Sequence, residues 1–189
     1  MTRVLIAYAT SEGHTAKIAE YIAGVIREHG HQAYPVNVGR TTPDPRAYDA
    51  VIVGGSIHKG RHQTAVGEYV RETREHLERL PTAFFSVSLV VASGTEQGRK
   101  DAWACAEEFF RLTQWRPSRV ELVAGALLYT QYNFLVRWIM KRIARSYGSQ
   151  DLDTSRDYVY TDWSALRRFA EEFLETAVPA RLAAHGVGG

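Results

Sequence analysis

The feature that most constrains this fold is the alternation of short apolar runs with longer helical patterns along the chain. Such an alternation is typical of a parallel sheet covered by helices on both faces. The expected strands are Val4–Ala9, Ala33–Val38, Ala50–Gly54, Ala83–Val91 and Val120–Leu128. The expected helices are about Thr15–His29, Thr64–Leu80, Glu96–Leu112 and a last helix that Thr161 or Asp162 can cap.

The handedness of the connections restricts the order of these five strands. Right-handed crossovers favour a three-layer α/β fold with a parallel sheet of order 2-1-3-4-5. In this order a ligand binds at the carboxyl ends of strands 1 and 3, where the direction of winding reverses. We expect one domain over residues 1–178, with a helical insertion at about 128–157 after or within strand 5. Residues 179–189 are expected to form a flexible tail.

The turn after the first strand has the composition of a phosphate-binding loop. It reads Thr10-Ser11-Glu12-Gly13-His14-Thr15, and a helical pattern follows it. The unpaired N–H groups and the positive dipole end of a helix attract a phosphate, and glycine lets the backbone approach closely. The hydroxyls would add donors, whereas the Glu12 carboxylate would point away from the anion. An ordinary turn capped by Ser or Thr is the alternative interpretation.

Two further loops are expected at the same edge of the sheet. One follows strand 3 and includes Ser56, Ile57, His58 and Lys59. The other surrounds the end of strand 4 and includes Ser86, Val87, Ser88 and Leu89. The first of these loops also gathers cations that are candidates to contact an acidic substrate, namely His58, Lys59, Arg61 and His62. A solvated loop is the alternative interpretation of this cluster.

Composition excludes several classes of protein. The single cysteine, Cys105, allows no internal disulfide and fits a reducing compartment. We expect no secretory signal, and no stretch approaches the ~18 apolar residues of a membrane span. No Cys/His spacing suggests a metal site, and we expect no nucleic-acid partner. The net charge of +2 hides one asymmetry, because no acidic residue lies between Glu121 and Asp151.

That gap falls in the expected insertion, whose centre has helical spacing from Phe134 to Arg145. Apolar residues that include Leu135 share one arc of this helix, and Trp138 lies near the opposite arc. The cations on the opposite arc are Arg137, Lys141, Arg142 and Arg145. This composition is typical of a helix at an anionic membrane surface. A helix that docks its apolar arc on its own domain is the alternative.

With these features in view, the chain resembles the flavodoxin-type, quinone-dependent protoporphyrinogen oxidase family of bacterial haem synthesis. The resemblance runs from Arg3 to about Phe173. Its most specific motifs are Gly54-x-Ser56-Ile57 with Gly60, Pro81-x-Ala83-Phe84-Phe85-Ser86-Val87, Gln114-Trp115-Arg116-Pro117, Ala124-Gly125-Ala126-Leu127-x-Tyr129, Ile139-Met140-Lys141, Asp153-Thr154 and Tyr160-Thr161-Asp162-Trp163. The chain departs from the family at Ser88, where the family has Asn, and in the less basic run Val91–Glu96.

The resemblance implies FMN as the cofactor, with its phosphate on Thr10–Thr15 and its ring between the Ser56–Lys59 and Ser86–Leu89 loops. It implies dehydrogenation of protoporphyrinogen IX to protoporphyrin IX, with menaquinone or ubiquinone as the acceptor. The insertion would then hold the enzyme on the cytoplasmic face of the cell membrane, and a lid over the active site is the alternative role for it. The general base and the oligomeric state stay open, with a homo-oligomer among the options.

Three other functions fit a chain of this type. The first is an NAD(P)H:quinone reductase of flavodoxin fold, for which no separate nucleotide motif is needed. The second is a non-enzymatic flavodoxin electron carrier, although such carriers are usually strongly acidic so that they dock on basic partners. The third is a flavodoxin-like interaction protein without flavin. The donor that reduces the flavin separates the first, and a yellow purified protein excludes the third.

Overall fold

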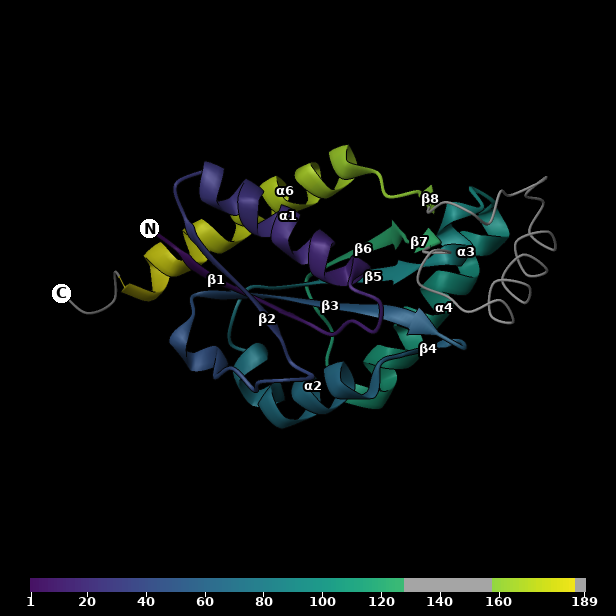
Figure 1. Cartoon of the computed structure of the whole chain (residues 1–189). Helices are drawn as coiled ribbons and strands as arrows, with labels where there is room; N and C mark the ends of the chain where they lie inside the picture. The colour runs from purple at the N-terminus through teal and green to yellow at the C-terminus, as the bar shows by residue number, and fades with distance from the viewer. Residues whose placement is uncertain (128–157, 186–189) are drawn as a thin grey trace.

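The computed structural model describes residues 1–127 and 158–185 (Figure 1). Its main sheet contains five parallel strands, which are β1 (Arg3–Tyr8), β2 (Gln32–Asn37), β3 (Ala50–His58), β5 (Thr82–Ser88) and β6 (Arg119–Ala124). They lie in the order β2-β1-β3-β5-β6. This order confirms the expected 2-1-3-4-5 arrangement, since β5 and β6 are the fourth and fifth strands of the parallel set. A 3-10 turn, η1 (Pro45–Ala47), precedes β3.

One layer of helices covers each face of the sheet. Helices α1 (His14–Glu28) and α6 (Trp163–His185) pack together on one face, and α2 (Thr64–Leu77) and α4 (Glu96–Thr113) pack on the other (Figure 1). Alternation along β1 builds both cores, because Val4 and Ile6 are buried on the α1 and α6 side. Leu5 and Ala7 are buried on the α2 and α4 side. The predicted three-layer α/β fold is confirmed.

The end of the third strand differs from the prediction. β3 continues past Gly54 to His58 and turns back into the short antiparallel strand β4 (Arg61–His62). The expected loop after strand 3 is therefore a β-hairpin. Its turn consists of Lys59 and Gly60, which have φ values of 50° and 76°. Positive φ at both central residues is typical of the type I′ turn that matches the twist of paired strands.

The fourth and fifth strands are shorter than predicted. β5 ends at Ser88, and the apolar residues that follow form the short helix α3 (Leu89–Ala92). The fifth strand is interrupted at Gly125, and its continuation β7 (Ala126–Leu127) pairs with β8 (Tyr158–Val159) in a separate antiparallel ribbon. Apolar composition did not reveal either break, because the residues on both sides of each break are similarly apolar.

The C-terminal helix extends further than predicted. We expected a flexible tail from residue 179, but α6 continues through Pro179 to His185. An internal proline removes one helical hydrogen bond. The exposed position of Pro179 and the strong helix formers after it, Ala180 to Ala184, favour continuation of the helix. The predicted division into a domain of residues 1–178 with an insertion stays a prediction.

The predicted insertion at about 128–157 lies outside the described residues. The same is true of the residues predicted to face a membrane, which are Leu135, Arg137, Trp138, Lys141, Arg142 and Arg145. Across residues 1–127 and 158–185, none of the helices combines the length and apolarity that crossing a membrane requires.

Candidate functional site

The carboxyl ends of β1, β3 and β5 meet at one edge of the sheet and define the candidate site. Tyr8 at the end of β1 lies beside Gly54, and Gly55 lies beside Ser86 of β5. The chain leaves β1 toward one face of the sheet and β3 toward the other, so this edge contains the switch point where α/β folds bind ligands. Each of the three predicted binding segments begins at this edge.

Residues 10–13 form an open loop at the amino end of α1. Gly13 is the N-cap residue with φ of 85°, and its N–H donates to Thr10 Oγ1 at 2.8 Å. It contributes no capping side chain, so the N–H groups of the first helical turn lack the partner that a cap usually provides. A Cβ placed on Gly13 would meet no atom within 4 Å. Open space beside free N–H donors at the positive end of a helix fits a phosphate.

The side chain of His14 connects this loop to the residues that precede α6. Its ring is buried, and its Nε2 lies 2.8 Å from Thr161 Oγ1, which in turn donates to the Ala124 carbonyl oxygen at 2.8 Å. Because the Thr161 proton is used on Ala124, His14 Nε2 carries a hydrogen and donates to Thr161. Burial, with a smaller effect of Lys17, lowers the pKa of His14, so its ring is neutral at pH 7. The side chain of His14 therefore ties the loop to the start of α6, and its backbone N–H remains at the open end of α1.

The β3–β4 hairpin brings exposed basic side chains to the rim of the site. His58, Lys59 and Arg61 are exposed, and Ser56 Oγ lies 3.1 Å from His58 Nε2. The hairpin also contacts α4, where the Cys105 thiol donates to the Gly60 carbonyl oxygen at 3.4 Å. Three of the four predicted substrate-contact residues thus lie where solutes reach them.

The fourth, His62, points into the molecule. Its ring packs against Phe84 and Phe109, with centroid distances of 5.2 and 5.0 Å, and its Nε2 lies 2.9 Å from Ser86 Oγ. Burial lowers the pKa of His62 to about 4, which makes the ring neutral at pH 7. The prediction that His62 contacts substrate is corrected, because adjacent residues of a strand face opposite sides and Arg61 takes the outer side.

The segment Ser86–Leu89 is more regular than predicted. Ser86, Val87 and Ser88 are buried residues of β5, and Leu89 begins α3. Ser86 Oγ is occupied by His62, whereas the buried Ser88 Oγ has no hydrogen-bond partner among the described residues. Ser88 Oγ is therefore a buried hydroxyl at this strand end that the described contacts leave unpaired.

Two residues of the site were missed in the sequence. Thr161 holds His14 across a separation of 147 residues, and the motif Tyr160-Thr161-Asp162-Trp163 was the signal that could have found it. Gln63, the N-cap residue of α2, reaches the loop after β1. Gln63 lies outside the loop Thr10–Thr15 and outside the family motifs, so nothing in the sequence pointed to it.

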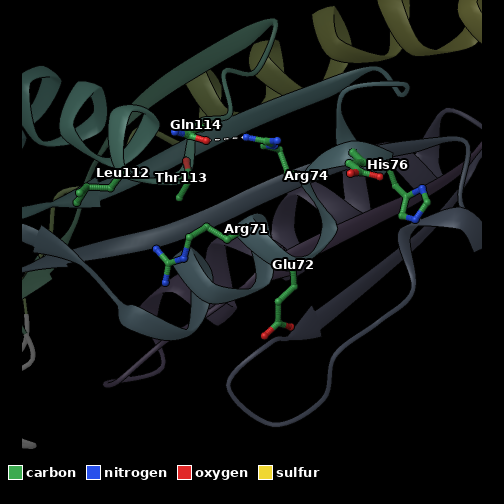
Figure 2. A pocket seen from close by; sticks show the side chains of 8 residues that line it. Arg71, Glu72, Arg74, His76, Leu112, Thr113 and Gln114 are labelled. Atoms are coloured by element: carbon green, nitrogen blue, oxygen red, sulfur yellow. Dashed lines mark hydrogen bonds between the residues drawn. The ribbon is translucent and has the colours of Figure 1, made fainter.

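A hollow of about 360 Å³ lies at the other edge of the sheet, between the final turns of α2 and α4 (Figure 2). Arg74 Nη1 donates to Gln114 Oε1 at 2.8 Å along this hollow. Helix α2 ends just before β5 begins, and Gln114 lies just before β6. The hollow therefore lies at the amino ends of these two strands. It is therefore separate from the candidate site at the strand ends. No group of three or more His, Cys, Asp or Glu residues that could hold a metal ion occurs in the described part of the chain.

The sheet order and the open loop after β1 define a flavodoxin-like domain, a class that binds a flavin at this edge. The sequence model of the flavodoxin domain family matches residues 5–154. Solved flavodoxins have the same fold. Oxidised flavodoxin 2 from Bacillus cereus has a TM-score of 0.55 at 17% identity, covering 92% of this chain and 99% of that one. A flavodoxin from the domain Archaea has a TM-score of 0.53 at 13% identity, covering 93% and 98%.

Sequence relatives refine this assignment. The protoporphyrinogen IX dehydrogenase (quinone) of Escherichia coli strain K12 is 37% identical over 171 residues, which cover 90% of this chain and 93% of that protein. The protein of the same name from Leishmania major is 33% identical over 189 residues, covering 98% of this chain and 81% of that one. The chain belongs to the flavodoxin domain family and, within it, to the group of these quinone-dependent dehydrogenases.

Proposed function

We propose that this protein binds FMN and dehydrogenates protoporphyrinogen IX to protoporphyrin IX, with a respiratory quinone as the electron acceptor. The observation that carries the proposal is the 37% identity to a protoporphyrinogen IX dehydrogenase (quinone) across 90% of the chain. The open loop with Gly13 in the left-handed conformation supports it, because it offers a place for the FMN phosphate.

The residues around the strand ends have separate tasks in this proposal. Backbone N–H groups of Glu12, His14 and Thr15, with the Thr10 and Thr15 hydroxyls, would hold the phosphate. The ends of β3 and β5, at Ser56–Lys59 and Ser86–Leu89, would hold the ring, and Ser88 Oγ, which has no partner among the described residues, would hydrogen-bond it. The flavin, when bound, supplies two-electron chemistry, and the protein positions it and tunes it.

The number of electrons removed from the substrate determines how often the acceptor must reoxidise the flavin. Conversion of a porphyrinogen to a porphyrin removes six electrons, so a two-electron cofactor must be reoxidised three times per product. Menaquinone and ubiquinone dissolve in the membrane, and we propose that the basic segment with Arg137, Lys141, Arg142 and Arg145 holds the enzyme on its cytoplasmic face. The choice between the two quinones follows from the membrane in which the protein works.

The basic side chains of the hairpin would suit the substrate's propionates. His58, Lys59 and Arg61 are exposed on β3, the turn and β4, beside the strand ends that would hold the ring. Exposed ion pairs each contribute only about 0.2–1 kcal/mol, so these residues would orient the substrate more than they would tighten its binding.

Complementation tests the proposal in a cell. Expression of this chain in a bacterium that lacks its own protoporphyrinogen oxidase should restore haem synthesis and growth. A Gly13→Val variant, which we expect to lose its flavin, serves as the negative control. A folded, flavin-loaded wild-type protein that fails to restore growth would contradict the proposed activity.

A further inference from the structure

Gln63 connects the second helix to the phosphate loop. It follows β4 directly and is the N-cap residue of α2, yet its side chain makes no capping hydrogen bond to that helix. The side chain instead reaches the residues that follow β1, 52 positions earlier in the sequence. The backbone of Gln63 starts its own helix, since its carbonyl oxygen accepts from the N–H groups of Val66 and Gly67. Its side chain takes no part in this, and the side-chain contacts belong to the neighbouring loop.

The orientation of the Gln63 amide follows from its neighbours. With Nε2 facing Ala9, the amide donates to the Ala9 carbonyl oxygen at 2.7 Å. Its Oε1 then accepts from the Ser11 N–H at 3.0 Å and from Ser11 Oγ at 2.9 Å. The opposite orientation keeps only a bond from Nε2 to Ser11 Oγ and sets oxygen against oxygen at Ala9. Only the first orientation satisfies the donors and the acceptors alike, so the amide nitrogen faces Ala9.

These contacts fix the first half of the loop. The Ala9 N–H donates to the Gly54 carbonyl oxygen at 3.2 Å, and the Gly13 N–H donates to Thr10 Oγ1 at 2.8 Å. Gln63 adds bonds to both Ala9 and Ser11 between these two points. The Ser11 N–H consequently donates to Gln63 and the Gly13 N–H to Thr10, so the backbone donors that remain for a phosphate are those of Glu12, His14 and Thr15.

We propose that Gln63 is a positioning residue for the FMN phosphate. Its hydrogen bonds hold Ala9 and Ser11 in place, so that the open N–H groups of the loop already have their binding arrangement before FMN binds. The inference rests on the proposed function, since it assumes FMN on this loop. A loop ordered in advance loses less conformational entropy on binding, and affinity rises accordingly. The adjacent His62 is hydrogen-bonded to Ser86, so His62 and Gln63 together contact the ends of both β1 and β5.

Flavin titration of the apoprotein tests the inference. Gln63→Met keeps the length of the side chain and removes its hydrogen bonds, and Gln63→Glu keeps an acceptor for Ser11 but cannot donate to Ala9. Gln97→Met is the matched control, because Gln97 is exposed on α4 and donates to Asp101 of its own helix. Affinity is measured for FMN and for riboflavin, which lacks the phosphate.

We expect both Gln63 variants to bind FMN about tenfold more weakly, the effect of losing one to two net hydrogen bonds. Riboflavin affinity and the Gln97→Met variant should stay within about twofold of wild type, since neither depends on this loop. In the apoprotein, the Ser11 amide should also exchange its hydrogen faster in Gln63→Met, while amides of β1 keep their protection.

The outcomes separate this inference from the proposed function. Wild-type apoprotein that does not bind FMN would overturn the proposed function. Wild-type protein that binds FMN, with unchanged FMN affinity in both Gln63 variants, would overturn the positioning role alone. Equal losses for FMN and riboflavin would also overturn it, because they would show a general distortion of the site.

Discussion

Replacement of Gly13 by valine is the sharpest test of the phosphate loop. Gly13 has φ of 85°, a conformation that costs an L-residue roughly 1–2 kcal/mol and a β-branched residue more. A Cβ at Gly13 would meet no atom within 4 Å, so the cost arises from the backbone rather than from a clash. A loop that escapes this strain by adopting a negative φ must break the bond from the Gly13 N–H to Thr10 Oγ1 and turn the neighbouring N–H groups away.

The expected loss of affinity is much larger than the loss of stability. Hydrogen bonds to a charged group contribute about 1.5–3 kcal/mol each, so misdirecting two of them weakens FMN binding by roughly 100-fold or more. The matched control is Gly30→Val, because Gly30 has φ of 77°, has nothing within 4 Å of its Cβ position, and lies at the other end of α1. Both variants should therefore lose similar stability by urea unfolding of the apoprotein, and only Gly13→Val should purify without flavin.

Two results would refute this reasoning. A Gly13→Val protein that purifies with its full complement of FMN would show that the phosphate does not lie on this loop. Equal loss of flavin in Gly13→Val and Gly30→Val would show that retention follows general stability and not the shape of the loop.

Two other predictions concern the site, and a third concerns the basic segment of the expected insertion. Burial lowers the pKa of His62 to about 4. Between pH 6.5 and about 4, His62 therefore binds a proton in the unfolded chain but not in the folded protein. The free energy of unfolding should fall by on the order of 3 kcal/mol as the pH drops through this window. Urea unfolding should show that the free energy of unfolding of His62→Gln falls clearly less over this pH range than that of the wild type. An identical pH dependence in the two proteins would contradict the buried neutral ring. Changing Lys59 and Arg61 together to Gln should raise the KM for protoporphyrinogen IX about fivefold at unchanged kcat, whereas the same change at Arg46 and Arg79 should leave it unaltered. Changing Arg137, Lys141, Arg142 and Arg145 to Gln should lower binding to anionic liposomes and spare FMN affinity; unchanged liposome binding would point to a solvated basic face.

The fold and the position of the Gly13 loop between β1 and α1 could be read from the sequence because their signals are local, whereas phosphate binding by this loop stays a prediction. Buried parallel strands such as Val4–Tyr8 are continuously apolar, and Gly13 sits between a strand and a helix within a few residues. Long apolar runs do not show where a strand stops, which is why the helix at Leu89 and the break at Gly125 were not predicted.

Side-chain direction near the site could not be read from the sequence. The orientation of His62 depends on the pairing of β4, a strand of two residues that is too short to show any periodicity. The contacts from Gln63 to Ala9 and from Thr161 to His14 join residues that meet only when the sheet edge is assembled. Tertiary packing, and not local preference, therefore decides which polar residues support the loop.

Direct turnover tests the central claim. Purified protein is loaded with FMN, mixed with protoporphyrinogen IX and a quinone in the absence of oxygen, and followed by porphyrin fluorescence. We expect porphyrin to appear only when protein, FMN and quinone are all present, with three quinones reduced per porphyrin formed. Flavin-loaded protein that forms no porphyrin but reduces the quinone with NAD(P)H at turnover rates would contradict the account and identify a quinone reductase instead.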